Sequence, residues 1–126
     1  MNTLEPIDSS NAPGAVGPYS QAIAFGEFVF TSGSLPIDPV SKKIPEDVKA
    51  QAKQALSNLK AILETAGSGM NKVVKSTVFL TDINDFAAVN EVYATFFDKP
   101  FPARSCFAVA ALPMGAKVEV EVVAVK

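Results

Sequence analysis

The chain has 126 residues, of which 48% are hydrophobic, and this length suits a single domain, residues 1–126, with its own core. The formal net charge of −2, the lack of histidine and the single cysteine argue against nucleic-acid binding, a zinc site and an internal disulfide, so we expect a cytoplasmic protein with no metal. No apolar run is long enough to cross a membrane, and residues 1–10 lack the basic start and the apolar run of a secretory signal.

Hydrophobic periodicity predicts a pair of amphipathic helices between β-strands. In chain order, the expected elements are hairpin strands over 22–25 and 28–31, a helix over 46–66, a strand over 73–80, a second helix from Asp82 or Asn84 to about Phe97, and strands over 103–110 and 117–125. Gly26 is the expected hairpin turn, and Gly67 is expected to end the first helix. This β-β-α-β-α-β-β order predicts an α+β fold with both helices on one face of a mixed sheet.

The other face of this sheet would lack a cover within one chain. It would hold Arg104, Cys106, Ala108 and Ala110, or else the residues that alternate with them. Because so much of the chain is hydrophobic, we expect a second copy to cover this face.

Arg104 and the only cysteine, Cys106, lie two residues apart in a segment that reads Phe-Pro-Ala-Arg-Ser-Cys, so on a strand they share a face. The planar donor fork of a guanidinium matches the two oxygens of a small carboxylate. Spacing alone, however, favours a structural role, in which Arg104 is a surface residue or an ion-pair partner of Glu119 or Glu121. With no histidine to activate its thiol, Cys106 is expected to pack rather than to act as a nucleophile.

Several motifs in register give the chain a strong resemblance to a known family. They are Gly-Pro-Tyr-Ser-Gln-Ala at 17–22, Thr-Ser-Gly at 31–33, Phe-Leu-Thr-Asp at 79–82, Asn-Asp-Phe at 84–86, Phe-Pro-Ala-Arg-Ser-Cys at 101–106 and Val-Glu-Val-Glu at 118–121. Together they resemble the RidA/YjgF family of enamine/imine deaminases, from about Asn11 to the C-terminus. The resemblance implies a chorismate-mutase-like fold and a homotrimer with its sites between subunits. It also implies cofactor-free hydrolysis of 2-imino acids, formed from 2-aminoacrylate and 2-aminocrotonate, to 2-keto acids and ammonia.

The resemblance assigns roles to individual residues. Arg104 corresponds to the arginine that binds the substrate carboxylate, and Glu119 to the acidic residue that positions a water. Matches to positions that line the substrate site are Tyr19, Ser32, Gly33, Asn90 and Cys106. At Ser34 the chain departs from many close members, which have glutamine there, and this difference bears on substrate preference.

Most of these residues also have a structural explanation. Tyr19 is typical of a loop anchor, Ser32 and Gly33 of a turn, and Asn90 and Glu119 of a solvated surface.

The implied chemistry does not need a histidine. Imine hydrolysis requires a bound anion and a water held against the imine carbon, and a carboxylate of suitable pKa can orient or deprotonate that water. The main alternative is a non-catalytic trimer that binds 2-keto acids or other small carboxylates through Arg104. Ribonuclease activity is a further alternative, but the negative net charge and the absence of histidine argue against it. A chaperone-like role is left open.

Overall fold

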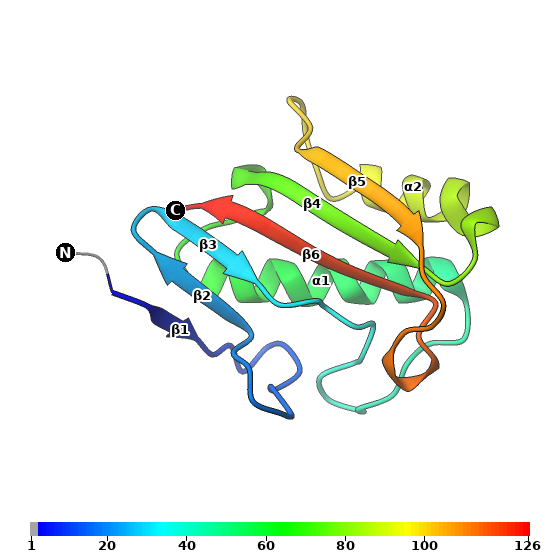
Figure 1. The fold of residues 1–126 in the computed structure, drawn as a ribbon, viewed down its shortest axis with the longest axis horizontal. Coiled ribbons are helices and arrows are strands. Elements are labelled where there is room, and N and C mark those ends of the chain that lie inside the picture. The colour runs from blue at the N-terminus through cyan, green and yellow to red at the C-terminus, as the bar shows by residue number, and fades with distance from the viewer. Residues whose placement is uncertain (1–2) are drawn as a thin grey trace.

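The computed structural model describes residues 3–126, and its strands form one six-stranded sheet in the order β1-β2-β3-β6-β4-β5 (Figure 1). The strands are β1 (Glu5–Ile7), β2 (Ala22–Phe25), β3 (Phe28–Thr31), β4 (Val73–Leu80), β5 (Ala103–Ala108) and β6 (Val118–Val125), and the helices are α1 (Val48–Thr65) and α2 (Phe86–Ala94). Strands β4 and β5 run parallel, whereas the other neighbours are antiparallel, so the sheet is mixed. The predicted α+β class is confirmed, with both helices on one face.

The first helix and the last two strands differ from their predicted ranges by one or two residues at an end, β5 ending at Ala108 and not at Ala110, and two differences are larger. Strand β1, which pairs antiparallel with β2 at the sheet edge, was not predicted, because three residues with Pro6 in the middle are too short to show a period. The predicted second helix is split: Asp82 accepts a hydrogen bond from the Asn84 N–H and caps a short 3-10 turn, Ile83–Asp85, and α2 then runs only from Phe86 to Ala94.

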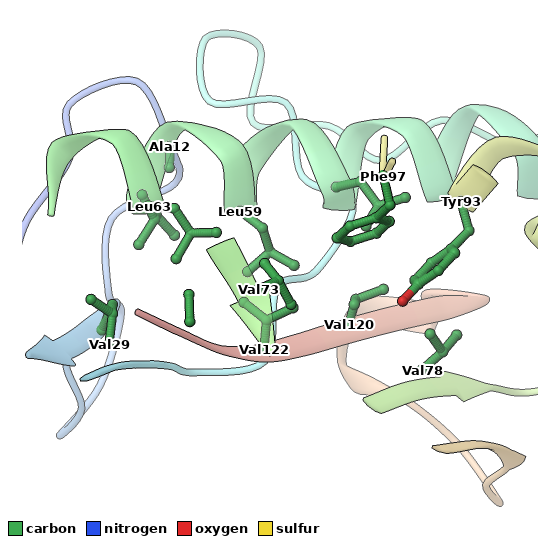
Figure 2. Close-up of a cluster of buried hydrophobic side chains, with 14 of the residues drawn as sticks. Ala12, Val29, Leu59, Leu63, Val73, Val78, Tyr93, Phe97, Val120 and Val122 are labelled. Atoms are coloured by element: carbon green, nitrogen blue, oxygen red, sulfur yellow. The ribbon is translucent and has the colours of Figure 1, made fainter. Parts of the chain in front are cut away.

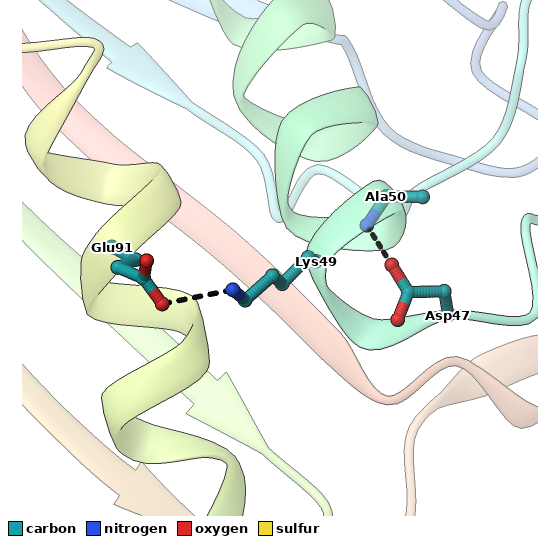
Figure 3. Close-up of polar contacts among 4 residues, drawn as sticks. All are labelled: Asp47, Lys49, Ala50 and Glu91. Carbon is teal, nitrogen blue, oxygen red and sulfur yellow. Dashed lines mark hydrogen bonds and ion pairs between the residues drawn. The ribbon is translucent and has the colours of Figure 1, made fainter.

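Helix α1 is held at both ends by local hydrogen bonds. The Asp47 carboxylate accepts the N–H of Ala50 at 3.0 Å and so caps the N-terminus (Figure 3). At the other end, Gly67 has a φ of +83°, and the N–H groups of Gly67 and Ser68 donate to the carbonyls of Glu64 and Leu63. This is a Schellman motif, which confirms the end predicted at Gly67.

The core lies between α1, α2 and one face of the sheet (Figure 2). Leu59 and Leu63 of α1 are fully buried, as are alternate residues of β6 such as Val118 and Val120. At the surface, Lys49 of α1 and Glu91 of α2 form an ion pair at 2.8 Å (Figure 3), and such exposed pairs add little stability.

The face of the sheet without helices carries exposed aromatic side chains. Phe28 and Phe30 of β3 are 46% and 45% exposed, and Phe107 of β5 is 46% exposed. Phe107 also packs edge-to-face on Phe79 of β4, with ring centres 5.4 Å apart. Exposed apolar patches of this kind are typical of interaction surfaces.

Within residues 3–126, neither helix has the combined length and apolar character that a bilayer crossing demands.

Candidate active site

One cluster of predicted site residues lies just beyond β3, against β6. The Ser34 N–H donates to the Val120 carbonyl at 2.7 Å, and the Val120 N–H donates back to the Ser34 carbonyl at 3.2 Å. This bridge holds Gly33 directly beneath the Glu119 side chain, so that a Cβ at position 33 would lie 2.7 Å from the Glu119 carboxyl carbon. Glycine allows this close approach, because a side chain at position 33 would push the Glu119 carboxylate away from its observed place.

Glu119 projects from the open face of β6, where it is half-buried. Burial, and secondly the negative charge of Glu121 on the same face, raise the pKa of the Glu119 carboxyl. A raised pKa brings a carboxylate closer to the working range of a general base. The predicted role of Glu119 in positioning or deprotonating water is therefore chemically suitable.

Glu119, Gly33, Ser32 and Tyr19 line one cavity of about 750 Å³, a volume within the usual range of ligand sites. Ser32 Oγ donates to the Ser20 carbonyl at 2.6 Å, so this hydroxyl fixes the loop before β2. Tyr19 is 49% exposed, and its hydroxyl accepts the Val16 N–H at 3.4 Å. Both residues therefore anchor loops as well as lining the cavity.

A second cluster surrounds Arg104 on β5, an edge strand of the sheet. Arg104 Nη1 donates to Asn90 Oδ1 at 2.7 Å, and the guanidinium carbon lies 4.7 Å from the ring centre of Tyr93 and 5.5 Å from that of Phe86. All three partners belong to α2, which begins at Phe86, and their spacing puts them on one helix face. Cation–π attraction and the hydrogen bond together hold the guanidinium in place.

Arg104 and Cys106 lie on the face that the helices cover, so the second of the two arrangements considered in the sequence analysis is the observed one. Strand register places them beside Ser76 and Val78 of β4, which are fully buried beneath the helices. The residues that alternate with them, among them Phe107, occupy the open face, as the second arrangement considered above requires. Alternation predicts which residues share a face but not which face the helices cover.

Cys106 is half-buried and packs against the core. Burial raises the pKa of its thiol, and the charge of Arg104 opposes that shift only in part. The thiol therefore stays protonated at neutral pH, which suits a packing role and not a nucleophile.

The two clusters do not meet within one chain. Arg104 lies on the helix face of β5, whereas Glu119 lies on the open face of β6, and β4 separates these two strands. The cluster around Gly33 and the cluster around Asn90 therefore lie apart within one chain. Within residues 3–126, no three acidic, cysteine or histidine side chains gather into a metal site.

Tyr93, Phe86 and Gln21 contribute to these clusters but were not predicted to do so. Tyr93 and Phe86 read as the apolar face of a helix, although their spacing with Asn90 was a signal that all three contact the same partner. Gln21 is buried, accepts the Ser9 N–H at 2.6 Å and donates to the Ser9 and Pro13 carbonyls. It fixes the loop that forms one wall of the cavity.

The fold and the two clusters define a small α+β protein with a guanidinium held in place on one face of the sheet and a half-buried carboxylate on the other. The sequence profile named Endoribonuclease L-PSP matches residues 9–126, and the chain belongs to this family, also called the RidA/YjgF family. It is 50% identical over 123 residues to the 2-iminobutanoate/2-iminopropanoate deaminase of Salmonella typhimurium, covering 95% of this chain and 96% of that protein.

Two solved structures are similar over nearly their whole length. Escherichia coli TdcF with bound serine superposes with a TM-score of 0.93 at 48% identity and covers 97% of this chain and 98% of its own. RidA from the Antarctic bacterium Psychrobacter superposes with a TM-score of 0.94 at 47% identity, and the match covers 97% of this chain and 99% of that RidA chain.

Proposed function

We propose that this protein is a hydrolytic deaminase that converts reactive 2-imino acids, derived from 2-aminoacrylate and 2-aminocrotonate, to 2-keto acids and ammonia. The relative from Salmonella, half of whose aligned residues are identical, is named as a deaminase of this kind. The observation that carries the proposal is the fixed guanidinium of Arg104. One of its donors is bound to Asn90 and its plane is held by aromatic rings, which leaves further donors of the fork for a carboxylate.

The proposed mechanism divides the work between the two clusters. Arg104 binds the substrate carboxylate, and Asn90 and Cys106 line that half of the site. Glu119 holds a water against the imine carbon and takes a proton from it as the C–O bond forms. Glu119 passes that proton to the nitrogen, which gives a carbinolamine. Glu119 then takes the hydroxyl proton of the carbinolamine and passes it to the leaving nitrogen, so that the carbonyl forms, ammonia leaves and Glu119 is ionised again. The balance requires only one water and no cofactor.

A complete site requires two copies of the chain, because Arg104 and Glu119 lie on opposite faces of the sheet. We propose a homotrimer in which the cluster at Tyr19, Ser32, Gly33 and Glu119 of one copy meets Arg104 of the next. A closed ring makes all contacts equivalent, and the exposed phenylalanines of the open face offer apolar area for it. Since 2-imino acids decay in water, the enzyme would act where they are released, which we propose is the cytoplasm.

The experiment that tests this function generates 2-aminoacrylate from serine with a dehydratase and follows its decay with and without the protein. Wild-type protein is expected to accelerate the decay, and Arg104→Ala to abolish the acceleration. Arg104→Lys is also expected to fail, because an ammonium cannot reproduce the two-point contact with a carboxylate. Lys53→Ala, on the exposed side of α1, is the matched control for the loss of a positive charge.

Each outcome separates the proposal from its alternative. No acceleration by the wild-type protein contradicts a deaminase. Thermal stabilisation by pyruvate or 2-oxobutanoate without any hydrolysis would instead support the non-catalytic trimer. Full activity of Arg104→Lys would show that the bidentate contact is not needed.

A further inference from the structure

The cavity beside Glu119 has one positively charged side chain on its wall. Among the residues of 3–126 that line it, Lys42 is the only cation and Glu119 the only anion. Neither residue takes part in the ion pairs formed within that range, so the two charges do not neutralise each other. Because Lys42 is exposed, its ammonium group can meet a charged ligand where the cavity opens to solvent.

The backbone at Lys42 has an unusual conformation for a lysine. Its φ is +65°, in the left-handed region that glycine adopts freely and that other residues seldom adopt. Within residues 3–126, Met114 is the only other non-glycine residue with a positive φ, and it lines the same cavity. Such conformations cost free energy and tend to persist at ligand sites. A lysine at a position that would suit glycine therefore indicates a use for its side chain.

Hydrogen bonds fix the turn that carries Lys42. Asp38 Oδ1 accepts the N–H groups of Val40 and Ser41 at 2.8 and 2.9 Å, and the Asp38 carbonyl accepts the Lys42 N–H at 2.9 Å. The Asp38 N–H donates to the Lys43 carbonyl at 2.9 Å. The backbone hydrogen bonds from Ser41 and Val40 are the main causes that lower the pKa of Asp38, and the charge of Lys42 adds least. The Asp38 carboxylate therefore serves the backbone of the turn and forms no ion pair with Lys42.

The buried polar side chains of the cavity wall already have protein partners. Asn58 Nδ2 donates to two carbonyls in the loop after β3, at 3.2 and 2.9 Å, and Ser34 Oγ donates to a carbonyl of α1 at 2.8 Å. Buried groups that are satisfied in this way offer little to an anion. Recognition of a second negative charge in this cavity therefore falls to Lys42.

We infer that Lys42 binds a second carboxylate, at the end of the substrate side chain, so that the substrates include 2-imino acids derived from acidic amino acids such as glutamate. The inference rests on the proposed function, in which Arg104 of a neighbouring copy binds the carboxylate next to the imine carbon and Glu119 holds the water. The reaction is unchanged: water adds to the imine carbon and ammonia leaves. The class of reaction that supplies such substrates is the oxidation of the α-amine of an acidic amino acid.

The test compares two imines of nearly equal size, which amino-acid oxidases generate from glutamate and from glutamine, with the alanine-derived imine as a reference. The measured quantity is kcat/KM for the glutamate-derived imine divided by kcat/KM for the glutamine-derived one. Lys42→Gly, which removes the cation and suits the positive φ, is expected to lower this ratio by about fivefold, the upper end for an exposed charge pair. Lys42→Glu is expected to lower it further. Added salt should lower the ratio of the wild type but not that of Lys42→Gly.

Lys43→Glu is the matched control, because Lys43 is exposed, does not line the cavity, and undergoes the same change of charge as in Lys42→Glu. Its ratio should fall much less. If the alanine-derived imine is hydrolysed while the glutamate-derived one decays at its uncatalysed rate, the inference is overturned and the proposed function stands. An unchanged ratio in both Lys42 variants, with thermal melts that show them folded, would also overturn it. If the protein accelerates none of the three, the proposed function itself fails.

Discussion

Replacing Gly33 by alanine tests whether the position of the Glu119 carboxylate matters for activity. The added Cβ would lie 2.7 Å from the carboxyl carbon and 2.9 and 3.0 Å from its oxygens. Carbon atoms pack best at about 3.5–4.0 Å, so the carboxylate must retreat by about 1 Å. Only the far end of a flexible side chain has to move, and Gly33 does not have a positive φ, so the backbone accepts alanine.

The expected result is a loss of activity without a loss of stability. A displacement of about 1 Å at a reacting group costs about 100-fold in rate, which equals about 2.7 kcal/mol of transition-state stabilisation. The free energy of unfolding should change by less than about 1 kcal/mol, because alanine in a permitted conformation also restricts the unfolded chain. The assays are kcat/KM on an oxidase-generated imine and a thermal melt.

Gly69→Ala is the matched control, because its Cβ would also meet only the end of a side chain, Asn71 Oδ1 at 3.0 Å, and Gly69 does not line the cavity. Wild-type activity in Gly33→Ala would refute the argument that Glu119 must lie at its observed position. If Gly33→Ala unfolds, the Glu119 side chain does not move aside to accommodate the added methyl group, and that part of the argument is refuted. Glu119→Asp, whose carboxylate is shorter, should cost less in the Gly33→Ala background than in the wild type.

Three further predictions concern pH and stability. Burial and Glu121 raise the pKa of Glu119, whose ionised form is the base, so kcat/KM should fall with falling pH through a midpoint above the ordinary glutamate value. Glu121→Gln should lower that midpoint, and an unchanged pH profile would contradict the coupling. Tyr93→Phe should cost about 1–3 kcal/mol of unfolding free energy, because it leaves the fully buried Ser76 hydroxyl without its 2.6 Å partner, and adding Ser76→Ala should recover much of that loss in chemical denaturation. Asp47→Ala should cost about 1 kcal/mol in the same assay through loss of the α1 cap, and a smaller effect than a surface substitution gives would contradict the capping role.

The long periodic elements were predictable from the sequence. The residue ranges predicted for β4 and for the β2–β3 hairpin agree with the structure, because alternation and the turn at Gly26 are local signals. Strand β1 was not predictable in this way, since its pairing with β2 is a tertiary contact and its three residues carry no period.

The site was only partly predictable. Alternation predicts that Arg104 and Cys106 share a face, but the choice of face depends on where α2 packs, and that is decided by long-range contacts. The same is true of the ring of Tyr93, which reads as core in the sequence and contacts Arg104 in the fold. The separation of Arg104 from Glu119 also depends on the strand order, which local patterns do not encode.

The most direct test of the account mixes two inactive variants. Arg104→Ala lacks the carboxylate-binding half of the site and Glu119→Gln lacks the base, so each alone should be inactive. If sites form between copies, unfolding the two variants together in equal amounts and refolding them should restore about one quarter of wild-type activity. Each site needs an intact Arg104 from one subunit and an intact Glu119 from its neighbour. In an equal mixture each of these residues is intact in half of the subunits, so about one site in four is complete. No recovery at any mixing ratio, with an active wild-type protein refolded in parallel, would contradict the claim that two copies build one site.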